Sequence, residues 1–284
     1  MSVMKNIRYS LVFTVLILCA LLAAGCTSSP ATGTQGTPIP SAVNTPAPSQ
    51  DSLLVYSGAG LKSTMEDVGK AFTEKYGISI QYNYGGSGTL ITQMNLTQKG
   101  DVFIPGSTVE YSTAKTQGLV GDYMMVAYHV PVIAVQKGNP KGITTIRDFA
   151  YPGLKVALGD TNATAIGKAG AKMFKNFNIT AAVEKNVVTR TPTINELVVI
   201  MNTGQADVSL LTLDQINKET MDAITIPARD NVVLIVPIGV TTFTKNQENA
   251  QKFADFVASD EGKAIFVRHG FPGYPDAAYA DVKP

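Results

Sequence analysis

From residue 53 onward, the chain alternates between short apolar runs typical of β-strands and longer runs with the apolar spacing of helices. Strand patterns cover residues 53–56, 78–84, 101–104, 130–135, 154–158, 187–189, 208–211, 232–236 and 240–244. Helical patterns lie between residues 63 and 77 and over residues 90–98, 109–116, 144–149, 165–177, 194–202, 247–257 and 260–269. Regular alternation of this kind predicts an α/β fold with mostly parallel strands and helices layered on them.

The N-terminus has the pattern of an export signal. Lys5 and Arg8 precede an apolar run over residues 11–24, which is shorter than the ~20 residues of a membrane-spanning helix. The sequence LAAGC at residues 22–26 resembles a lipobox. We therefore expect residues 1–25 to be removed as a signal peptide and Cys26 to carry a lipid, which places the protein at the outer face of the cell membrane. The alternative is a plain signal peptide followed by an incidental cysteine.

Residues 26–50 are predicted to be a lipidated cysteine followed by a tether, because they are rich in Ser, Thr, Pro and Gly and almost uncharged. The folded part then starts near residue 51. Since Cys19 and Cys26 are the two cysteines of the chain, the folded part offers no disulfide, thiolate metal site or cysteine nucleophile.

Charge and motifs exclude several classes of function. The 23 basic and 22 acidic residues nearly balance, which argues against nucleic-acid binding. The two histidines, His129 and His269, are isolated and lack metal-ligand spacing, and we interpret His129 as a packed or surface residue. Neither a P-loop nor a nucleophile elbow with a histidine partner is present. We therefore predict no enzyme activity, no metal site and no cofactor.

The stretch YGGSGTL at residues 84–90 joins a predicted strand to a predicted helix. Free backbone N–H groups at such a helix start, with the positive end of the helix dipole, favour an anion. We therefore predict that Ser87 and neighbouring amides, including that of Gly88, bind part of a small oxyanion. The alternative is a solvated turn in which Ser87 or Thr89 merely caps the helix.

Three further strand-to-helix turns carry hydroxyls or bare amides, at residues 57–60, 160–167 and 191–195. In α/β sheets, ligands lie beyond the carboxyl ends of the strands, so these turns together are expected to meet at one point. The alternative is that each turn only caps its own helix. None is dominated by Lys or Arg. Neutral donors and helix dipoles hold a fully ionised oxyanion well, and we interpret Asp160 and Glu196 as helix caps or as acids of the first helical turn.

These motifs resemble the molybdate/tungstate-binding lipoproteins of ABC importers, a family with the type II periplasmic-binding-protein fold. The resemblance runs from about residue 53 to residue 273 and is carried by LLVYSGAGL at 53–61, GSGTL at 86–90, GDVFIPG at 100–106, VALGD at 156–160, and NEL at 195–197 with GQAD at 204–207. It implies two lobes, each a mixed, mostly parallel sheet flanked by helices. Lobe one would comprise residues 51–131 and 238–284, and lobe two residues 132–237. Crossings near residues 130–131 and 237–238 would form a hinge that traps the ligand on closure.

The resemblance also implies specific ligand contacts. In that family two serines, two backbone amides and one tyrosine hold the oxyanion. The second serine corresponds to Ser87. The first corresponds to Gly60, so Ser57 or the amides of residues 58–60, that of Gly58 included, would have to substitute. The amides correspond to Ile166 and Ile194, and the tyrosine to Thr212. Archaeal relatives carry acids where this chain has Thr164 and Ile194, so a four-coordinate oxyanion, or a different small ligand, fits better.

The resulting expectation is a monomeric, lipid-anchored binding protein that delivers molybdate or tungstate to an ABC permease. Two alternatives stay open: a binding protein for another small anion or ligand, and a membrane-tethered sensor domain that reports its ligand state to a receptor. A hydrolase using Ser87 as nucleophile is disfavoured, since the sequence shows no base near it.

Overall fold

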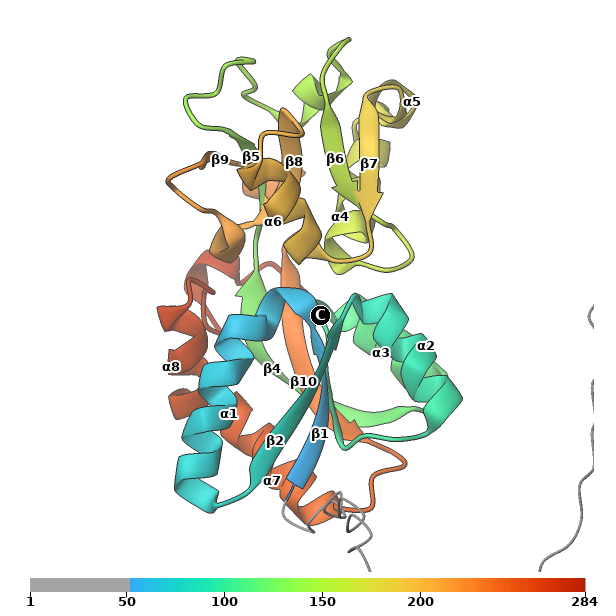
Figure 1. Cartoon of the computed structure of the whole chain (residues 1–284), viewed down its shortest axis with the longest axis vertical. Coiled ribbons are helices and arrows are strands. Elements are labelled where there is room, and N and C mark those ends of the chain that lie inside the picture. Colours follow the sequence, from blue (N-terminus) through green and yellow to red (C-terminus); the bar gives the residue numbers. More distant parts are fainter. Residues whose placement is uncertain (1–51, 284) are drawn as a thin grey trace, which may run out of the picture. The chain divides into compact units, whose positions relative to one another are not determined.

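A computed structural model describes residues 52–283, and all of these belong to a single compact unit. The predicted signal peptide, Cys26 and the tether lie outside the described residues. Two five-stranded sheets organise the described chain (Figure 1). Each sheet with the helices packed on it is called a lobe below, and the residue boundaries proposed for the lobes stay a prediction.

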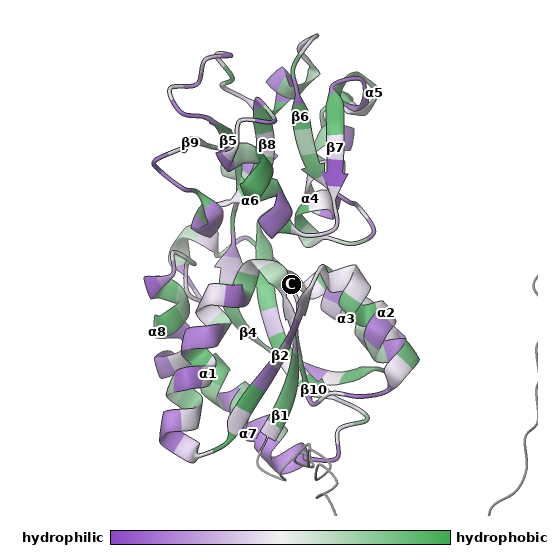
Figure 2. Ribbon diagram, viewed as in Figure 1, coloured by the Kyte–Doolittle hydropathy of each residue, from purple (hydrophilic) through white to green (hydrophobic). Residues whose placement is uncertain are grey.

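The sheet of lobe one has three parallel strands at one side and two antiparallel strands at the other. Its strands, in spatial order, are β2 (Ser79–Gly85), β1 (Ser52–Gly58), β3 (Val102–Ile104), β10 (Leu234–Thr241) and β4 (Val120–His129). The central strands β1 and β10 are predominantly apolar, whereas the edge strand β2 is largely polar (Figure 2). This difference follows from burial on both faces at the centre and partial solvation at the edge.

The sheet of lobe two repeats the same plan. Its strands, in spatial order, are β7 (Val187–Thr191), β6 (Val156–Gly159), β8 (Val208–Thr212), β5 (Pro131–Gln136) and β9 (Met221–Thr225). In both sheets the parallel strands end in turns that lead into helices. The turns of one sheet therefore gather at a single edge.

Helices cover both faces of the first sheet because side chains alternate along its strands. Leu53 and Val55 of β1 pack in the cluster that includes Phe72 and Phe253, whereas Tyr56 packs on the opposite face with Leu90. The first face is covered by α1 (Lys62–Tyr76), α7 (Gln247–Ala258) and α8 (Asp260–Arg268), and the second by α2 (Ser87–Thr97) and α3 (Thr108–Thr116).

The core of lobe two is one large apolar cluster between its sheet and its helices. These helices are α4 (Ala165–Asn176), α5 (Thr180–Glu184), α6 (Ile194–Asn202) and the short 3-10 helix η2 (Ile146–Ala150). Further 3-10 turns are η1 (Ala59–Leu61), η3 (Leu213–Gln215), η4 (Ala228–Asp230) and η5 (Ala277–Tyr279). Within residues 52–283, no helix is both long enough and apolar enough to span a bilayer.

The predicted α/β fold with mixed sheets is confirmed, although antiparallel pairings make up half of each sheet. Among the strands and α-helices, the sequence analysis missed β4, β9 and α5, and it divided β10 into two strands. The strand β4 was overlooked because Gly121, Asp122 and Tyr123 interrupt its apolar run. Pro237 and Ile238, near which one chain crossing was predicted, lie inside β10 and pair with β4.

Candidate functional site

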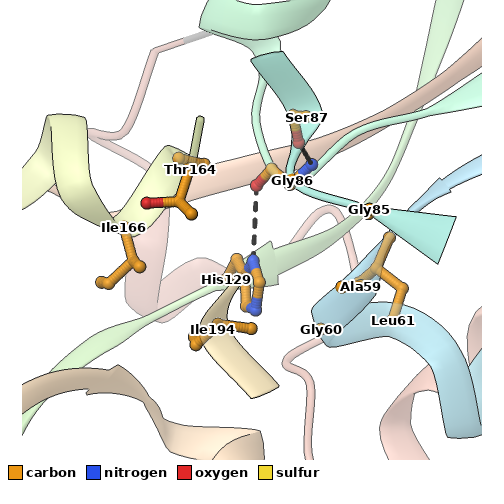
Figure 3. A pocket seen from close by; sticks show the side chains of 13 residues that line it. Ala59, Gly60, Leu61, Gly85, Gly86, Ser87, His129, Thr164, Ile166 and Ile194 are labelled. Atoms are coloured by element: carbon orange, nitrogen blue, oxygen red, sulfur yellow. Dashed lines mark hydrogen bonds between the residues drawn. The ribbon is translucent and has the colours of Figure 1, made fainter. Parts of the chain in front are cut away.

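A small cavity lies where the turns of the two lobes meet (Figure 3). Its volume is about 30 Å³, which is room for roughly two water molecules. Residues from both lobes line it: Gly58, Ala59, Gly60, Leu61, Gly85, Gly86, Ser87, Gly106 and His129 from lobe one, and Thr164, Ala165, Ile166 and Ile194 from lobe two. Residues from all four turns that the sequence analysis singled out therefore line the cavity. The turn at residues 191–195 contributes only residue 194 to the lining.

The N-termini of three helices meet at this cavity. The helices α2, α4 and α6 begin at Ser87, Ala165 and Ile194, and all three residues line it. The first N–H groups of a helix have no partner within the helix, and they carry the positive end of its dipole. Three such ends at one point favour an anion without a contribution from Lys or Arg, because neither is among the lining residues.

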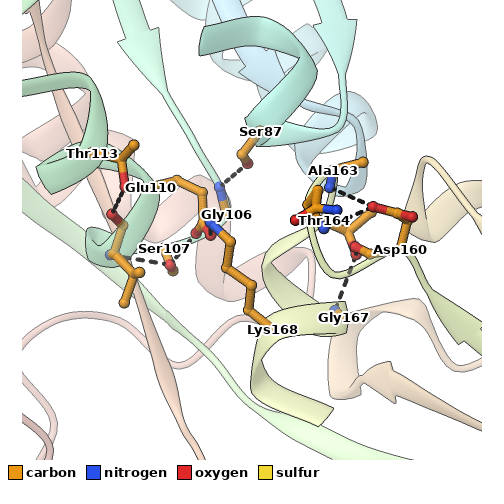
Figure 4. A network of polar contacts seen from close by, with 12 residues as sticks. Ser87, Gly106, Ser107, Glu110, Thr113, Asp160, Ala163, Thr164, Gly167 and Lys168 are labelled. Atoms are coloured by element: carbon orange, nitrogen blue, oxygen red, sulfur yellow. Dashed lines mark hydrogen bonds and ion pairs between the residues drawn. The ribbon is translucent and has the colours of Figure 1, made fainter. Parts of the chain in front are cut away.

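The Ser87 side chain lines the cavity and is held in place by a hydrogen bond that it accepts. The N-cap of α2 is Gly86 and has no side-chain cap bond, so Ser87 does not serve as the cap that the alternative interpretation requires. Ser87 is buried, and its Oγ accepts a hydrogen bond of 3.0 Å from the Gly106 N–H (Figure 4). A hydroxyl has one proton to donate. With an acceptor position of Ser87 already used, that proton is available to a ligand.

The two lobes approach closely at the start of α2 because the glycines at this point have no side chain. A Cβ on Gly86 would lie 2.3 Å from the Pro192 carbonyl oxygen, and one on Gly88 would lie 2.0 Å from that of Asn162. The Gly88 N–H donates a 3.0 Å hydrogen bond to the Ala163 carbonyl oxygen. Lobe one thus touches the backbone of lobe two directly at this edge of the cavity.

The helices of lobe two carry ordinary side-chain caps. Thr164 accepts a hydrogen bond from the Gly167 N–H of α4, and Thr193 accepts one from the Glu196 N–H of α6. Asp160 accepts bonds from the Asn162 and Ala163 N–H groups, which precede α4, so it orders the turn before the helix and Thr164 is the cap. In both helices the cap accepts its hydrogen bond from the N–H group at the third helical position. The amides at the first two positions, including that of Ile166, remain for a ligand.

His129, at the end of β4, is a cavity residue that the sequence analysis did not single out. It is 5% exposed. Its Nδ1 lies 3.3 Å from the Gly106 carbonyl oxygen, and its Nε2 lies 2.9 Å from Thr212 Oγ1 and 3.4 Å from Asp214 Oδ1. It is packed, as one of the two interpretations held, but against the ligand cavity. The available signal was its position at a strand end beside the predicted crossing at residues 130–131.

The eight predicted oxyanion-binding residues divide into two groups. Five line the cavity: Gly58, Gly60, Ser87, Ile166 and Ile194. The other three lie beside it. The Ser57 hydroxyl is fully buried and bonds the Gly58 carbonyl oxygen at 3.4 Å, the Gly88 amide bonds Ala163, and the Thr212 hydroxyl bonds His129. Their roles as ligand contacts stay predictions.

Gly60 and Ile194 face each other across the cavity. A Cβ built on Gly60 would lie 2.8 Å from Ile194 Cγ2, closer than two carbon atoms pack. The Ile194 side chain therefore occupies the space in which a serine at position 60 would stand. Within the part of the chain that the structure describes, no group of three or more His, Cys, Asp or Glu side chains is arranged to hold a metal ion.

Comparison with known proteins places the chain in a family. Residues 53–272 match the family of bacterial extracellular solute-binding proteins, and the chain belongs to this family. It is 28% identical over 229 residues to a Haemophilus influenzae protein named only as a binding protein, covering 77% of this chain and 90% of that one. It is 26% identical over 262 residues to the molybdate-binding protein ModA of Mycobacterium bovis, covering 91% of this chain and 95% of that one.

Solved structures support the same fold. The sulfate-binding protein SubI of Mycobacterium tuberculosis superposes with a TM-score of 0.71 at 19% sequence identity, over 82% of this chain and 91% of that one. The family to which the chain belongs is that of bacterial extracellular solute-binding proteins, so solute binding is the class of function to which the family points.

Proposed function

We propose that this protein captures molybdate or tungstate outside the cell and delivers it to an ABC importer. The observation that carries the proposal is the meeting of three helix N-termini and the Ser87 hydroxyl at one cavity whose lining contains no Lys or Arg. A doubly charged oxyanion accepts hydrogen bonds from every side, and helix N-termini supply such donors. The relationship to ModA favours molybdate, whereas sulfate, with the same charge and shape, is the alternative to test.

The type of donor favours a fully ionised oxyanion over a protonated one. A ligand that carries a proton, such as phosphate near pH 7, needs an acceptor in the site. Asp160 and Glu196, the carboxylates in the turns, are occupied with backbone amides and with the Thr193 hydroxyl. We therefore expect phosphate to bind more weakly than molybdate, tungstate or sulfate.

Isothermal titration calorimetry of the purified protein with molybdate, tungstate, sulfate and phosphate tests the proposal. Tight one-to-one binding of molybdate or tungstate supports it. A clear preference for sulfate would replace the ligand but retain the class of site, and a lack of response to all four anions would reject an oxyanion function.

The variant Ser87→Ala tests the site itself. Removing a donor to a buried charged acceptor costs about 1–3 kcal/mol, which corresponds to roughly a five- to 150-fold loss of affinity. Ser209→Ala is a matched control, because Ser209 is a fully buried serine on β8 that does not line the cavity. Equal affinities of both variants would reject Ser87 as a ligand contact.

The proposed partners and location follow from the sequence. A lipid on Cys26 would keep the protein at the outer face of the membrane, where the ABC permease receives the anion from a single copy of the chain. Incorporation of labelled fatty acid, lost in Cys26→Ala, tests the anchor. Hydrolysis by Ser87 is not supported, since in the described residues the ring nitrogens of His129 bond Gly106 and Thr212 rather than Ser87.

A further inference from the structure

Two side-chain carboxamides of lobe two bond the turn η1 of lobe one. Asn195, in the first turn of α6, donates a hydrogen bond of 2.9 Å from its Nδ2 to the Ala59 carbonyl oxygen. Gln215, in η3 after β8, donates one of 2.9 Å from its Nε2 to the Gly60 carbonyl oxygen. Both bonds therefore cross between the lobes, and they end on a turn whose three residues line the cavity (Figure 3).

The two bonds hold the peptide groups on both sides of Gly60. The Ala59 carbonyl belongs to the same planar peptide as the Gly60 N–H, and the Gly60 carbonyl belongs to the next peptide. Because a trans peptide points its carbonyl and its N–H in opposite directions, the bond to the Ala59 carbonyl also sets the direction of the Gly60 N–H. Glycine has more conformational freedom than any other residue, so a restraint has its largest effect at this position of η1.

The Gly60 N–H is a donor that the helical turn does not use itself. The turn η1 leads directly into α1, and the first N–H groups of a helical segment have no partner within it and face its start. Here the segment starts after Gly58, which lines the cavity together with Gly60. The family resemblance implies a serine hydroxyl at position 60, which glycine lacks. The Gly60 N–H is therefore the donor that this position can offer to an anion.

Both carboxamides are themselves fixed within lobe two. Asn195 is the second residue of α6 and follows Ile194, which begins the helix and lines the cavity. Gln215 also donates from Nε2 to Asp214 Oδ2 at 2.7 Å, and the Asp214 side chain is 2% exposed. A side chain that is already held loses little conformational entropy when it makes a further bond. The restraint on Gly60 thus comes from lobe two, and it exists only when the lobes are together.

We propose that Asn195 and Gln215 are positioning residues of the oxyanion site, which hold Gly60 so that its N–H donates to the bound anion. This inference rests on the proposed function. Neither side chain lines the cavity, so both act through the backbone of η1. The start of α6 then contributes in two ways: through the Ile194 N–H, which the sequence analysis predicted as a ligand contact, and through the bond from Asn195 to the opposite lobe.

Two apolar variants of similar size remove the donors. Asn195→Leu and Gln215→Met keep most of the volume of each side chain but cannot donate a hydrogen bond. In calorimetry with molybdate and with sulfate, each variant should bind about two- to twelvefold more weakly than the unaltered protein, which is the effect of one hydrogen bond. Gln136→Met is the matched control, because Gln136 donates to the Met201 and Ala206 carbonyl oxygens inside lobe two and does not line the cavity. It should retain the affinity of the unaltered protein.

Proton–nitrogen NMR of the backbone separates positioning from a purely structural role. In the unaltered protein, adding molybdate should shift the Gly60 N–H signal downfield, because its hydrogen would then lie against a charged oxygen. The shift of Gly60 should be smaller in Asn195→Leu and in Gln215→Met. The Ile166 N–H at the start of α4 is the internal reference, and its shift should be the same in all of these proteins. A general loss of structure would change both signals together.

If Asn195→Leu fails to fold, Asn195→Ser replaces it, because the serine hydroxyl is one bond shorter than the carboxamide and remains polar. Unchanged affinity in the variants of Asn195 and Gln215 would overturn the inference. A Gly60 signal that does not move in the unaltered protein while the Ile166 signal shifts would also overturn it, and would leave oxyanion binding intact. Absence of binding of molybdate, tungstate and sulfate by the unaltered protein would overturn the proposed function as well.

Discussion

The ammonium group of Lys168 on α4 lies 2.9 Å from the carboxylate of Glu110 on α3, so an ion pair connects lobe two to lobe one (Figure 4). Glu110 is 1% exposed, and its second carboxylate oxygen accepts a hydrogen bond from the Ser107 hydroxyl. This ion pair lies near the cavity, which both helices approach. Lys168 thus compensates a buried negative charge only when the two lobes are together.

Replacing Lys168 by methionine should destabilise the protein, because it leaves the Glu110 carboxylate buried without a cation. Breaking a fully buried pair costs about 3–5 kcal/mol. The Lys168 side chain is 36% exposed, so we expect a smaller loss of about 1–3 kcal/mol in the free energy of unfolding, measured with urea. The double variant Glu110→Gln with Lys168→Met should recover part of it.

The control for this prediction is Lys172→Met, which removes an exposed lysine from the same helix. It should change the free energy of unfolding by less than about 0.5 kcal/mol. If the two lysine variants lose equal stability, the pair with Glu110 contributes nothing measurable.

Adding a methyl group at Gly88 should prevent the close approach of the lobes. The new Cβ would lie 2.0 Å from the Asn162 carbonyl oxygen, a backbone atom that has little freedom to move away. We expect Gly88→Ala to weaken oxyanion binding more than tenfold. The helix-stabilising effect of Ala relative to Gly, roughly 0.5–1 kcal/mol, should offset part of the free energy of unfolding that is lost with the contacts between the lobes.

Calorimetry and urea unfolding of the same Gly88→Ala sample separate the two effects. Gly121→Ala is the matched control, because its new Cβ would have only ordinary contact, at 3.8 Å, with the Val240 carbonyl oxygen. Unchanged oxyanion affinity in Gly88→Ala would show that this contact between the lobes is not needed for binding.

Restoring a hydroxyl at position 60 should succeed only when Ile194 is shortened. In Gly60→Ser the new Cβ would lie 2.8 Å from Ile194 Cγ2, so the single variant should bind molybdate more weakly than the unaltered protein. Adding Ile194→Ala removes the clashing methyl group. The double-mutant cycle, built from binding free energies measured by calorimetry, should then show a favourable coupling of about 0.5–3 kcal/mol between the two substitutions. Additive binding free energies would contradict the steric conflict between a side chain at position 60 and Ile194.

Acid should destabilise the protein in part through Asp148. Burial by itself raises the pKa of this carboxyl, but hydrogen bonds from the Thr144 and Thr145 N–H groups outweigh it and hold the pKa below its ordinary value. The unfolded chain therefore binds the proton first as pH falls. The stabilisation is fully present above the ordinary aspartate pKa of about 3.9, and it is lost as pH falls through the lower pKa of the folded state.

Urea unfolding of Asp148→Asn between pH 2 and 7 checks this prediction. The variant should lose about 1–3 kcal/mol near pH 7, because a charged acceptor of several hydrogen bonds is removed, and the difference from the unaltered protein should shrink in acid. Asp255→Asn, on the exposed surface of α7, is the control. A difference that stays constant with pH would show that Asp148 does not titrate as described.

Much of the fold was readable from local patterns. Strands such as β1 and β6 are short apolar runs that end in glycine-containing turns, and helices such as α4 follow with caps that the sequence displays. The strands β4 and β9 were missed because an antiparallel strand at the edge of a sheet carries a weaker apolar pattern. These two strands are recognised only once their partners β10 and β5 are placed.

The sequence by itself determined the kind of donor that the site offers: backbone amides and the Ser87 hydroxyl at glycine-rich helix starts, with no basic residue among them. These are local properties, fixed by the residues next to one another in the chain. Only the tertiary structure decided which groups share the cavity. His129, Gly106 and Asp214 come from separate segments, and their contacts arise from the packing of two sheets. No local pattern records such contacts, because they depend on the position of the whole chain in space.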